Sequence, residues 1–544
     1  MYNIDWFKMT KRRNCSLLFV PTQCGGMENI MEEKSSKAIK TMSFMSFIIL
    51  CAKFMGLFRE TLIGSVYGQG YESDVLNTAS QIPLLFFDMT LGVAILSTFV
   101  PVFNNFLLKD GRERAEKFAC NFISFITLAA MLISVLGIIF SKQIVGFIAG
   151  GYETGKILET AGLLKILFPS IIFTAVAFVS VGLLQSYGEF NVPSLISLVS
   201  NSVMILYLFV FGDRFGLMGV AFSMFVAWTL QFFVQIPSLY KKGFRYRFSF
   251  NLRDKGIGEV AKLALPVLVS SWVQPVCTLI NTKIGSTLGD GIVSGLNWAN
   301  KIYIIMVGVF AYAVTNFIFP KLSRQSAGGD DDGFAKTTRS SLGWTLFIIG
   351  FIASLFVALS EPIIKVVFER GAFTAENTKV TATALYYYSF GMMGYAVCEI
   401  LNKSFYAIKD GVTPMIVSIL GVIVNIGSML LLVFVFKKEI GGLALATTIS
   451  SVFIAAMLMF MINRKRKNVI NAEFVWDLVK IIVCSVLSAI TAGFIYGVAD
   501  KVMSGGMLIT LAKLCIAGIP ALSVYLTMAF LIRVKMLTEL RRRR

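Results

Sequence analysis

Long runs of apolar residues, separated by short polar segments, follow one another along almost the whole chain. A helix needs roughly 20 mainly apolar residues to cross the hydrocarbon core of a bilayer, and most of the runs reach that length. Because backbone groups in lipid must find their partners within the chain, these runs are predicted to be helices. The alternation typical of a membrane β-barrel is absent. The pattern therefore predicts an all-α polytopic membrane protein.

We predict about fourteen transmembrane helices, several of which are longer than a span requires and are expected to tilt or to extend beyond the bilayer. Hydrophobic residues make up 56% of the 544 residues and charged residues only 15%, too few to cover a soluble chain of this length. The predicted spans are 41–67, 74–106, 115–140, 157–187, 192–212, 217–240, 258–288, 291–321, 335–358, 377–407, 413–436, 441–462, 474–499 and 506–532.

Basic residues give the chain a formal net charge of +19, but their positions do not indicate a nucleic-acid partner. They lie in short segments between spans, such as 109–117, 241–255 and 464–467, where they report topology. Lys and Arg are concentrated on the side that carries the N-terminus, the even-to-odd loops and the C-terminus. Both termini of this multi-pass protein are therefore predicted to be cytoplasmic.

Three pairs of short segments indicate that the chain contains an internal repeat. Spans 1–6 and 7–12 are predicted to form two related six-helix lobes around a central cavity, with two C-terminal helices outside the repeat. The pairs are FVPVF (99–103) with IFPKL (318–322), LLQSYGEFNVPSL (183–195) with SFYAIKDGVTPMI (404–416), and GLMGVAFS (216–223) with GGLALATT (441–448).

This repeat divides the chain into five expected parts. The first is a cytoplasmic tail that is either poorly ordered or the product of a mis-assigned start. The parts are the N-terminal tail (1–37), the N-lobe (38–240), a basic cytoplasmic linker (241–257), the C-lobe (258–467), and the last two spans with a basic cytoplasmic tail (468–544).

Charged residues inside the apolar spans are the candidate functional residues, because a charge near the bilayer centre costs several kcal/mol and usually faces a wet cavity or a partner. An excess of cations from both lobes suggests an anionic ligand, whose oxygens suit Arg and Lys. The alternative is that the cations form structural ion pairs with the acids, for example Arg59 with Asp88. The candidates are Lys53, Arg59, Glu60, Asp74, Asp88, Lys283 and Lys301.

Asp88 and three further residues are candidates for hinges or gates in the predicted helices. Gly56 lies between Lys53 and Arg59 and permits a bend that brings the two cations nearer. Pro83 and Pro275 each remove a backbone donor and loosen their helices, although a simple packing kink is an equal alternative.

No enzyme site emerges from the sequence. There is no histidine, which rules out Ser-His and Cys-His arrangements and removes the commonest metal ligand. The cysteines show no paired spacing, and no phosphate-binding loop of the P-loop type is present. We therefore predict neither a metal site nor a cofactor.

The segment KFMGLFRETLIGSVYGQGYESDVLNTASQIP (53–83) resembles the opening helices of the MurJ (MviN) family of lipid II flippases. The matching elements are GLFRE at 56–60, YG at 67–68 and SD at 73–74. The resemblance covers about residues 38–465 and places the chain in the multidrug/oligosaccharidyl-lipid/polysaccharide exporter superfamily. Other matching segments are FVPVF (99–103), FPKLSR (319–324), RGAFTAENT (370–378) and FYAIKDGVTP (405–414).

This resemblance implies a bacterial inner-membrane flippase that works by alternating access. Its implied partner is lipid II, the undecaprenyl-pyrophosphate disaccharide pentapeptide, besides membrane lipids and cell-wall synthesis proteins. The family's cavity cations map onto Lys53, Arg59 and Lys301, and its acid maps onto Asp74. Spans 13–14 resemble a pair that forms a lipid-tail groove.

The sequence departs from the family pattern at several positions. Lys53 and Lys301 stand where Arg is frequent, and Asp88 or the preceding Phe87 stands where many members have another cation. We find no acid suited to the sodium site that some members have in the seventh or eleventh span, so coupling to the membrane potential or to a monovalent cation stays open. The alternatives are a flippase for another lipid-linked oligosaccharide and, from a different class, an intramembrane glycosyltransferase.

Overall fold

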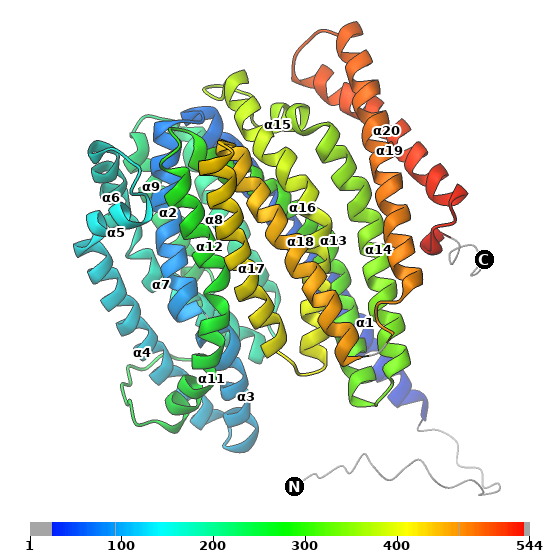
Figure 1. Ribbon diagram of the computed structural model, residues 1–544. Helices are drawn as coiled ribbons and strands as arrows, with labels where there is room; N and C mark the ends of the chain where they lie inside the picture. Colours follow the sequence, from blue (N-terminus) through cyan, green and yellow to red (C-terminus); the bar gives the residue numbers. More distant parts are fainter. Residues whose placement is uncertain (1–23, 93, 467, 538–544) are drawn as a thin grey trace, which may run out of the picture. The chain divides into compact units, whose positions relative to one another are not determined.

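The computed structural model describes residues 24–92, 94–466 and 468–537 (Figure 1). Within these ranges the chain forms helices and turns and no strand. It divides into two units, residues 1–47 and 48–544. Of the predicted N-terminal tail, residues 1–23 lie outside the described ranges, whereas residues 24–37 are helical and begin α1.

The helices follow the predicted apolar runs closely. In chain order they are α1 (Cys24–Tyr67), α2 (Tyr71–Phe87), η1 (Asp88–Gly92), η2 (Ala94–Phe99), α3 (Val100–Lys109), α4 (Arg112–Ile139), α5 (Ser141–Ile148), α6 (Thr154–Leu167), α7 (Ser170–Ser186), α8 (Asn191–Phe211), α9 (Gly216–Phe233), α10 (Ile236–Lys241), α11 (Lys255–Ser271), α12 (Val273–Gly285), α13 (Ile292–Ala327), α14 (Asp331–Ala358), α15 (Ser360–Phe368), α16 (Ala375–Ala407), α17 (Val412–Leu430), η3 (Leu431–Val435), α18 (Glu439–Lys465), α19 (Ala472–Val502) and α20 (Met507–Leu531).

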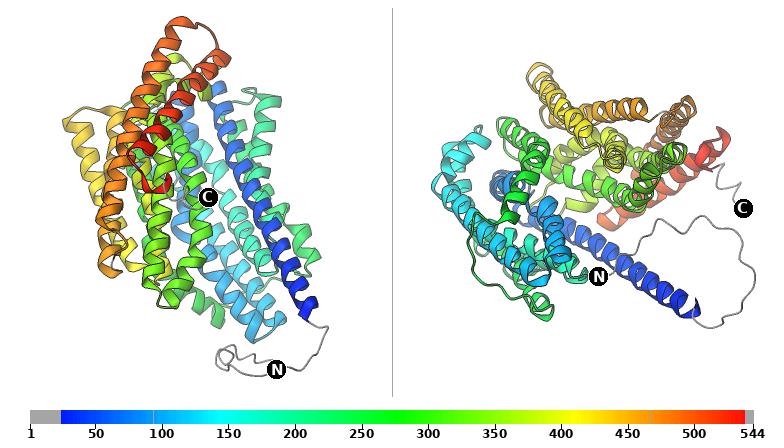
Figure 2. Two further views of the ribbon diagram at one scale, coloured as in Figure 1. Left: turned by 90° about the vertical axis from the view of Figure 1, so that its right-hand side faces the viewer. Right: turned by 90° about the horizontal axis from the view of Figure 1, so that it is seen from below.

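Nine helices of the described chain are long and apolar enough to cross a membrane, or ten if the bent pair α6 and α7 is one span. The other predicted spans coincide with helices that are short, polar or broken. The protein is therefore an all-helical, polytopic membrane protein. Within residues 48–544, α19 and α20 pack against each other beside α14 (Figures 1 and 2).

Three of the four hinge or gate candidates lie beside irregular helix geometry. Pro83 lies inside α2, where it removes one ladder bond and crowds the preceding turn. The helix widens into the π-helical segment η1 five residues later, at Asp88. Pro275 lies in the first turn of α12, just after the break from α11 at Trp272. In contrast, α1 continues through Gly56 without a break, and at this residue it passes Asn201 of α8.

Two glycine turns pack directly against each other at one end of the helices. Gly68 (φ 65°) follows α1, and Gly371 (φ 58°) lies in the turn between α15 and α16. A Cβ on Gly371 would meet the backbone oxygen of Ser65, and the backbone N–H of Ala372 donates to the same oxygen at 2.8 Å. The contact explains why YG and RGAFT must keep their glycines.

Replacing Gly371 with alanine is expected to destabilise the protein by more than the roughly 1–2 kcal/mol of a left-handed residue, because the added Cβ also collides with a backbone atom. The thermal unfolding midpoint in detergent should fall clearly below that of the wild type. Gly155→Ala is the control, since nothing lies within 4 Å of its Cβ. Equal midpoints for the two variants would contradict the packing argument.

Candidate functional site

Glu60 is the centre of an ion cluster that joins α1 to α13. Its Oε1 accepts from the Arg59 guanidinium at 2.5 Å and from Lys301 Nζ at 2.7 Å. Its Oε2 accepts from the Trp298 indole N–H at 3.1 Å. The Trp298 ring is stacked on Phe368 with ring centroids 5.4 Å apart. The carboxylate is 4% exposed, so the aromatic core holds one buried anion between two cations.

The cluster forms one wall of a cavity of about 180 Å³. Arg59 is oriented by Asn201 of α8, whose Oδ1 accepts from Nη1 at 2.9 Å. Asn77 and Gln81 of α2 line the cavity, and Gln81 also donates to Asn297 of α13 at 2.5 Å. The other lining residues are Ile63, Leu76, Ser80, Leu84, Met204, Met224 and Trp228. Two cations against one carboxylate leave the wall with an excess positive charge.

This cavity is small for a ligand site, since pockets for drug-sized ligands occupy roughly 300–1,000 Å³. Its volume of about 180 Å³ matches a compact anionic group better than a whole glycolipid head. The structure therefore represents a state in which the space around Arg59 and Lys301 is narrow.

The remaining sequence-predicted residues lie elsewhere. Lys53 is half-buried on α1 and is not among the residues that line this cavity. Lys283 lies on α12 with its ammonium 4.6 Å from the ring centroid of Phe147 on α5. Asp88 is exposed at the start of η1, and Arg59 pairs with Glu60 instead of Asp88.

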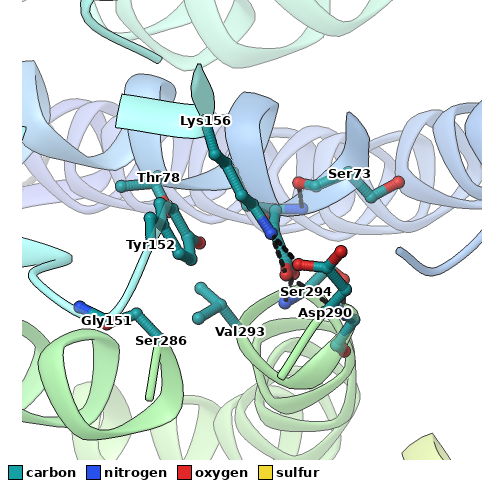
Figure 3. Close-up of polar contacts among 12 residues, drawn as sticks. Ser73, Thr78, Gly151, Tyr152, Lys156, Ser286, Asp290, Val293 and Ser294 are labelled. Carbon is teal, nitrogen blue, oxygen red and sulfur yellow. Dashed lines mark hydrogen bonds and ion pairs between the residues drawn. The ribbon is translucent and has the colours of Figure 1, made fainter. Parts of the chain in front are cut away.

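Asp74 belongs to a second buried cluster, the Lys156 cluster, which consists of Asp74, Lys156, Asp290, Gly291 and Ser294. Lys156 Nζ of α6 donates to Asp74 Oδ2 at 3.0 Å and to Asp290 Oδ1 at 2.6 Å. The backbone N–H groups of Gly291 and Ser294 donate to Asp74, each at 2.8 Å. Figure 3 shows Lys156 pointing toward Asp290, which lies next to Ser294 on the opposite side.

The Lys156 cluster closes the space between helices that are far apart in sequence. Asp74 is fully buried and caps the N-terminus of α13, where free N–H groups and the helix dipole favour an anion. The Lys156 ammonium also lies 4.2 Å from the Tyr152 ring centroid. Beside the cluster, Gln69 donates to the Gly291 carbonyl at 2.8 Å. Asp74 therefore ties α2 and α6 to α13.

Sequence reasoning named Arg59, Glu60, Lys301 and Asp74, but it missed the residues that complete the two clusters, Trp298 in the first and Lys156 and Asp290 in the second. Lys156 precedes the predicted span 157–187 by one residue and was indistinguishable from a loop lysine. Asp290 and Trp298 carried no motif of their own. The contacts join residues 82, 134 and 238 positions apart, a separation that no local pattern reports.

The family model described as "Lipid II flippase MurJ" matches residues 63–515 of the chain. A relative in Buchnera aphidicola, named probable lipid II flippase MurJ, is 27% identical over 417 residues, 76% of this chain and 81% of the relative. The Rickettsia prowazekii protein of the same name is 25% identical over 499 residues, 90% of this chain and 97% of the relative.

Solved structures show the same architecture. A lipid II flippase MurJ in an inward closed conformation is 25% identical, with a TM-score of 0.75 over 90% of this chain and 98% of that chain. An inward-facing multidrug resistance transporter of the MATE family, in the MOP superfamily, is 12% identical with a TM-score of 0.66. It covers 78% of this chain and 98% of its own and supports the fold alone.

Proposed function

This chain belongs to the lipid II flippase MurJ family, and on that premise we propose that it moves lipid II between the leaflets of the bacterial inner membrane. It is a transporter rather than an enzyme. Lipid II carries a pyrophosphate between its sugar and its polyprenyl chain. The observation that supports a site for this group is that two cations, from α1 and α13, share one buried carboxylate at the wall of one cavity.

Arg59 and Lys301 would bind the pyrophosphate in this proposal. In the structure both cations are held by Glu60. A pyrophosphate offers more acceptor oxygens and more charge than one carboxylate, and Arg binds phosphate oxygens with a planar fork. Glu60 would then keep the two cations in place while the site is empty and compete with a weaker anion. Lys53, which precedes Arg59 by six residues on α1, would contact the substrate as it enters the cavity.

Alternating access would proceed by opening the end that the Lys156 cluster closes. The cluster joins Asp74 and Lys156 to the start of α13. The contact between the two glycine turns, in which Ala372 donates to Ser65, lies just before α2. Both must separate before the cavity opens at that end. The substrate would neutralise the excess charge around Arg59 and Lys301 and so favour approach of the helices around it.

We also propose fourteen spans in two six-helix lobes, with α19 and α20 outside them. The support is a repeated order of elements: the 28-residue helix α4 is followed by the 8-residue α5, and the 28-residue α14 by the 9-residue α15. The distribution of Lys and Arg supports cytoplasmic termini. The Lys156 cluster would then face the periplasm.

A driving force can come from the membrane potential, which is worth about 2.3 kcal/mol per elementary charge per 100 mV. The membrane potential would drive a cycle in which the empty cavity carries a net positive charge as the protein returns to its starting conformation. Coupling to a monovalent cation would also draw on the potential. Translocation by purified protein in vesicles should then depend on an imposed potential.

Depletion and complementation tests the proposed substrate. In a bacterium depleted of its own MurJ, this chain should restore growth and normal lipid II levels at the outer leaflet. Failure by a well-expressed, correctly inserted protein would favour another lipid-linked oligosaccharide. Turnover of lipid II in detergent would instead indicate a glycosyltransferase.

Lys301→Arg is expected to retain complementation, because a guanidinium can keep both the charge and the bond to Glu60. Lys301→Met should fail to complement, because the site would lose one of the two cations proposed to bind the pyrophosphate and Glu60 would pair with Arg59 alone. Growth at matched membrane levels is the measurement. Loss of function in the arginine variant would show that the compact ammonium itself is required.

A further inference from the structure

A second pocket lies outside the cavity around Arg59, between η1, α5 and the α11–α12 break. Its volume is about 480 Å³, and nearly all of its wall is apolar. Its residues come from three directions: Leu85 and Met89 from the α2–η1 helix, Ile144 and Phe147 from α5, and Leu279 from α12. We call it the seam pocket.

The seam pocket faces lipid rather than the cavity between the lobes. Leu279 and Lys283 are four residues apart and share one face of α12. Asn281 and Thr282, which line an interior polar cavity with α13, α16 and α18, lie on another face. Two aromatic side chains at the rim, Phe147 and Trp272, are 71% and 44% exposed. In a membrane protein, exposed apolar rims of this kind contact acyl chains.

The cation Lys283 lies beside Phe147 at this rim. The Lys283 ammonium lies 4.6 Å from the Phe147 ring centroid, so it sits over a residue that also lines the pocket. Among the described residues no carboxylate lies within ion-pair distance of Lys283. The pocket and the ammonium complement the two parts of a phospholipid: the apolar wall suits an acyl chain, and the ammonium suits the phosphate.

We infer that the seam pocket binds one anionic phospholipid from the surrounding bilayer, with an acyl chain in the pocket and its phosphate on Lys283. Its wall is the π-helical segment η1, whose Met89 carbonyl accepts from the Trp272 indole N–H at 2.7 Å. This bond bridges the two helices that the pocket separates. A bound acyl chain would therefore pack against both sides of an inter-helix contact.

The chain offers a closely matched control for the headgroup contact. Lys142 and Lys283 are both exposed lysines, but Lys142 is outside the pocket wall while Gln143, Ile144 and Phe147 belong to it. On α5 Lys142 projects away from those three residues, given 100° per residue. Lys142→Gln therefore removes the same charge from the same region without touching the site.

Native mass spectrometry of the full chain, with dioleoyl-phosphatidylglycerol or dioleoyl-phosphatidylcholine added, tests the inference. Lys283→Gln should lower phosphatidylglycerol occupancy at one site by about fivefold, the effect of one lysine beside an anionic lipid phosphate. Phosphatidylcholine binding should change little, and Lys142→Gln should match the wild type. Leu279→Trp, which fills the pocket, should remove the tightest-bound lipid of either kind.

Tryptophan fluorescence quenching locates the lipid without using Leu279→Trp, so a folding defect in that variant does not affect the result. The Trp272 signal, taken as the difference between wild type and Trp272→Phe, should be quenched more by brominated phosphatidylglycerol than by brominated phosphatidylcholine. Lys283→Gln should abolish that difference. Equal loss of phosphatidylglycerol binding in Lys283→Gln and Lys142→Gln, or quenching that ignores the headgroup, would overturn the assignment.

Discussion

Arg59→Ala is expected to abolish complementation while leaving the amount of protein in the membrane unchanged. The substitution removes the guanidinium that contacts both Glu60 and Asn201 at the cavity wall. Hydrogen bonds to charged groups contribute about 1.5–3 kcal/mol each, so lipid II should bind roughly 10- to 150-fold more weakly. Lipid II binding by purified protein is the direct measurement.

The partners that remain in Arg59→Ala, together with one further variant, separate binding from folding. In Arg59→Ala, Glu60 still keeps Lys301 and Trp298 as partners, so the buried carboxylate stays compensated and the fold should survive. Asn201→Ala should cause a smaller loss, because it removes only the group that orients the guanidinium. If Arg59→Ala complements fully, the pyrophosphate site is not at this cluster.

Lys156→Met is expected to have the second large effect, by opening the end that the Lys156 cluster closes. The variant leaves Asp74 fully buried, with two backbone N–H partners and no cation. Removing one partner of a buried ion pair typically costs about 3–5 kcal/mol, so the closed arrangement should lose most of its advantage. Complementation should be impaired even where the protein is present at normal levels.

Thiol accessibility reports this opening. Val293 lies at the cluster and is 2% exposed (Figure 3). In the purified protein, a cysteine at position 293 should react with a maleimide much faster in the Lys156→Met background. Lys165→Met is the matched control, because Lys165 is an exposed lysine on the same helix. Equal reaction rates in the two backgrounds would show that Lys156 does not hold this end closed.

Most predicted spans coincide with helices because lipid imposes a strong local rule: each apolar run must satisfy its own backbone. Nine or ten helices of the described chain, rather than fourteen, are long and apolar enough to cross a membrane. The broken elements were harder to predict. Pro83 indicated a weakness in α2, but no sequence signal predicted the π-helical segments η1 and η2 that follow it. Asp88 and Arg59 both read as in-span charges, yet only Arg59 faces the cavity, since helix rotation and pairing depend on neighbours.

The sequence by itself determined that the protein is helical and membrane-embedded, which runs form helices, and that Arg59, Glu60 and Lys301 are costly charges requiring partners. The tertiary structure alone decided who those partners are. It joined Arg59 and Lys301 through Glu60, paired Asp74 with Lys156 and the start of α13, and placed Lys283 beside Phe147 of α5. The physical reason is that hydrophobic periodicity specifies a helix and its apolar length, whereas the pairing of buried charges is set by contacts between helices far apart in the chain.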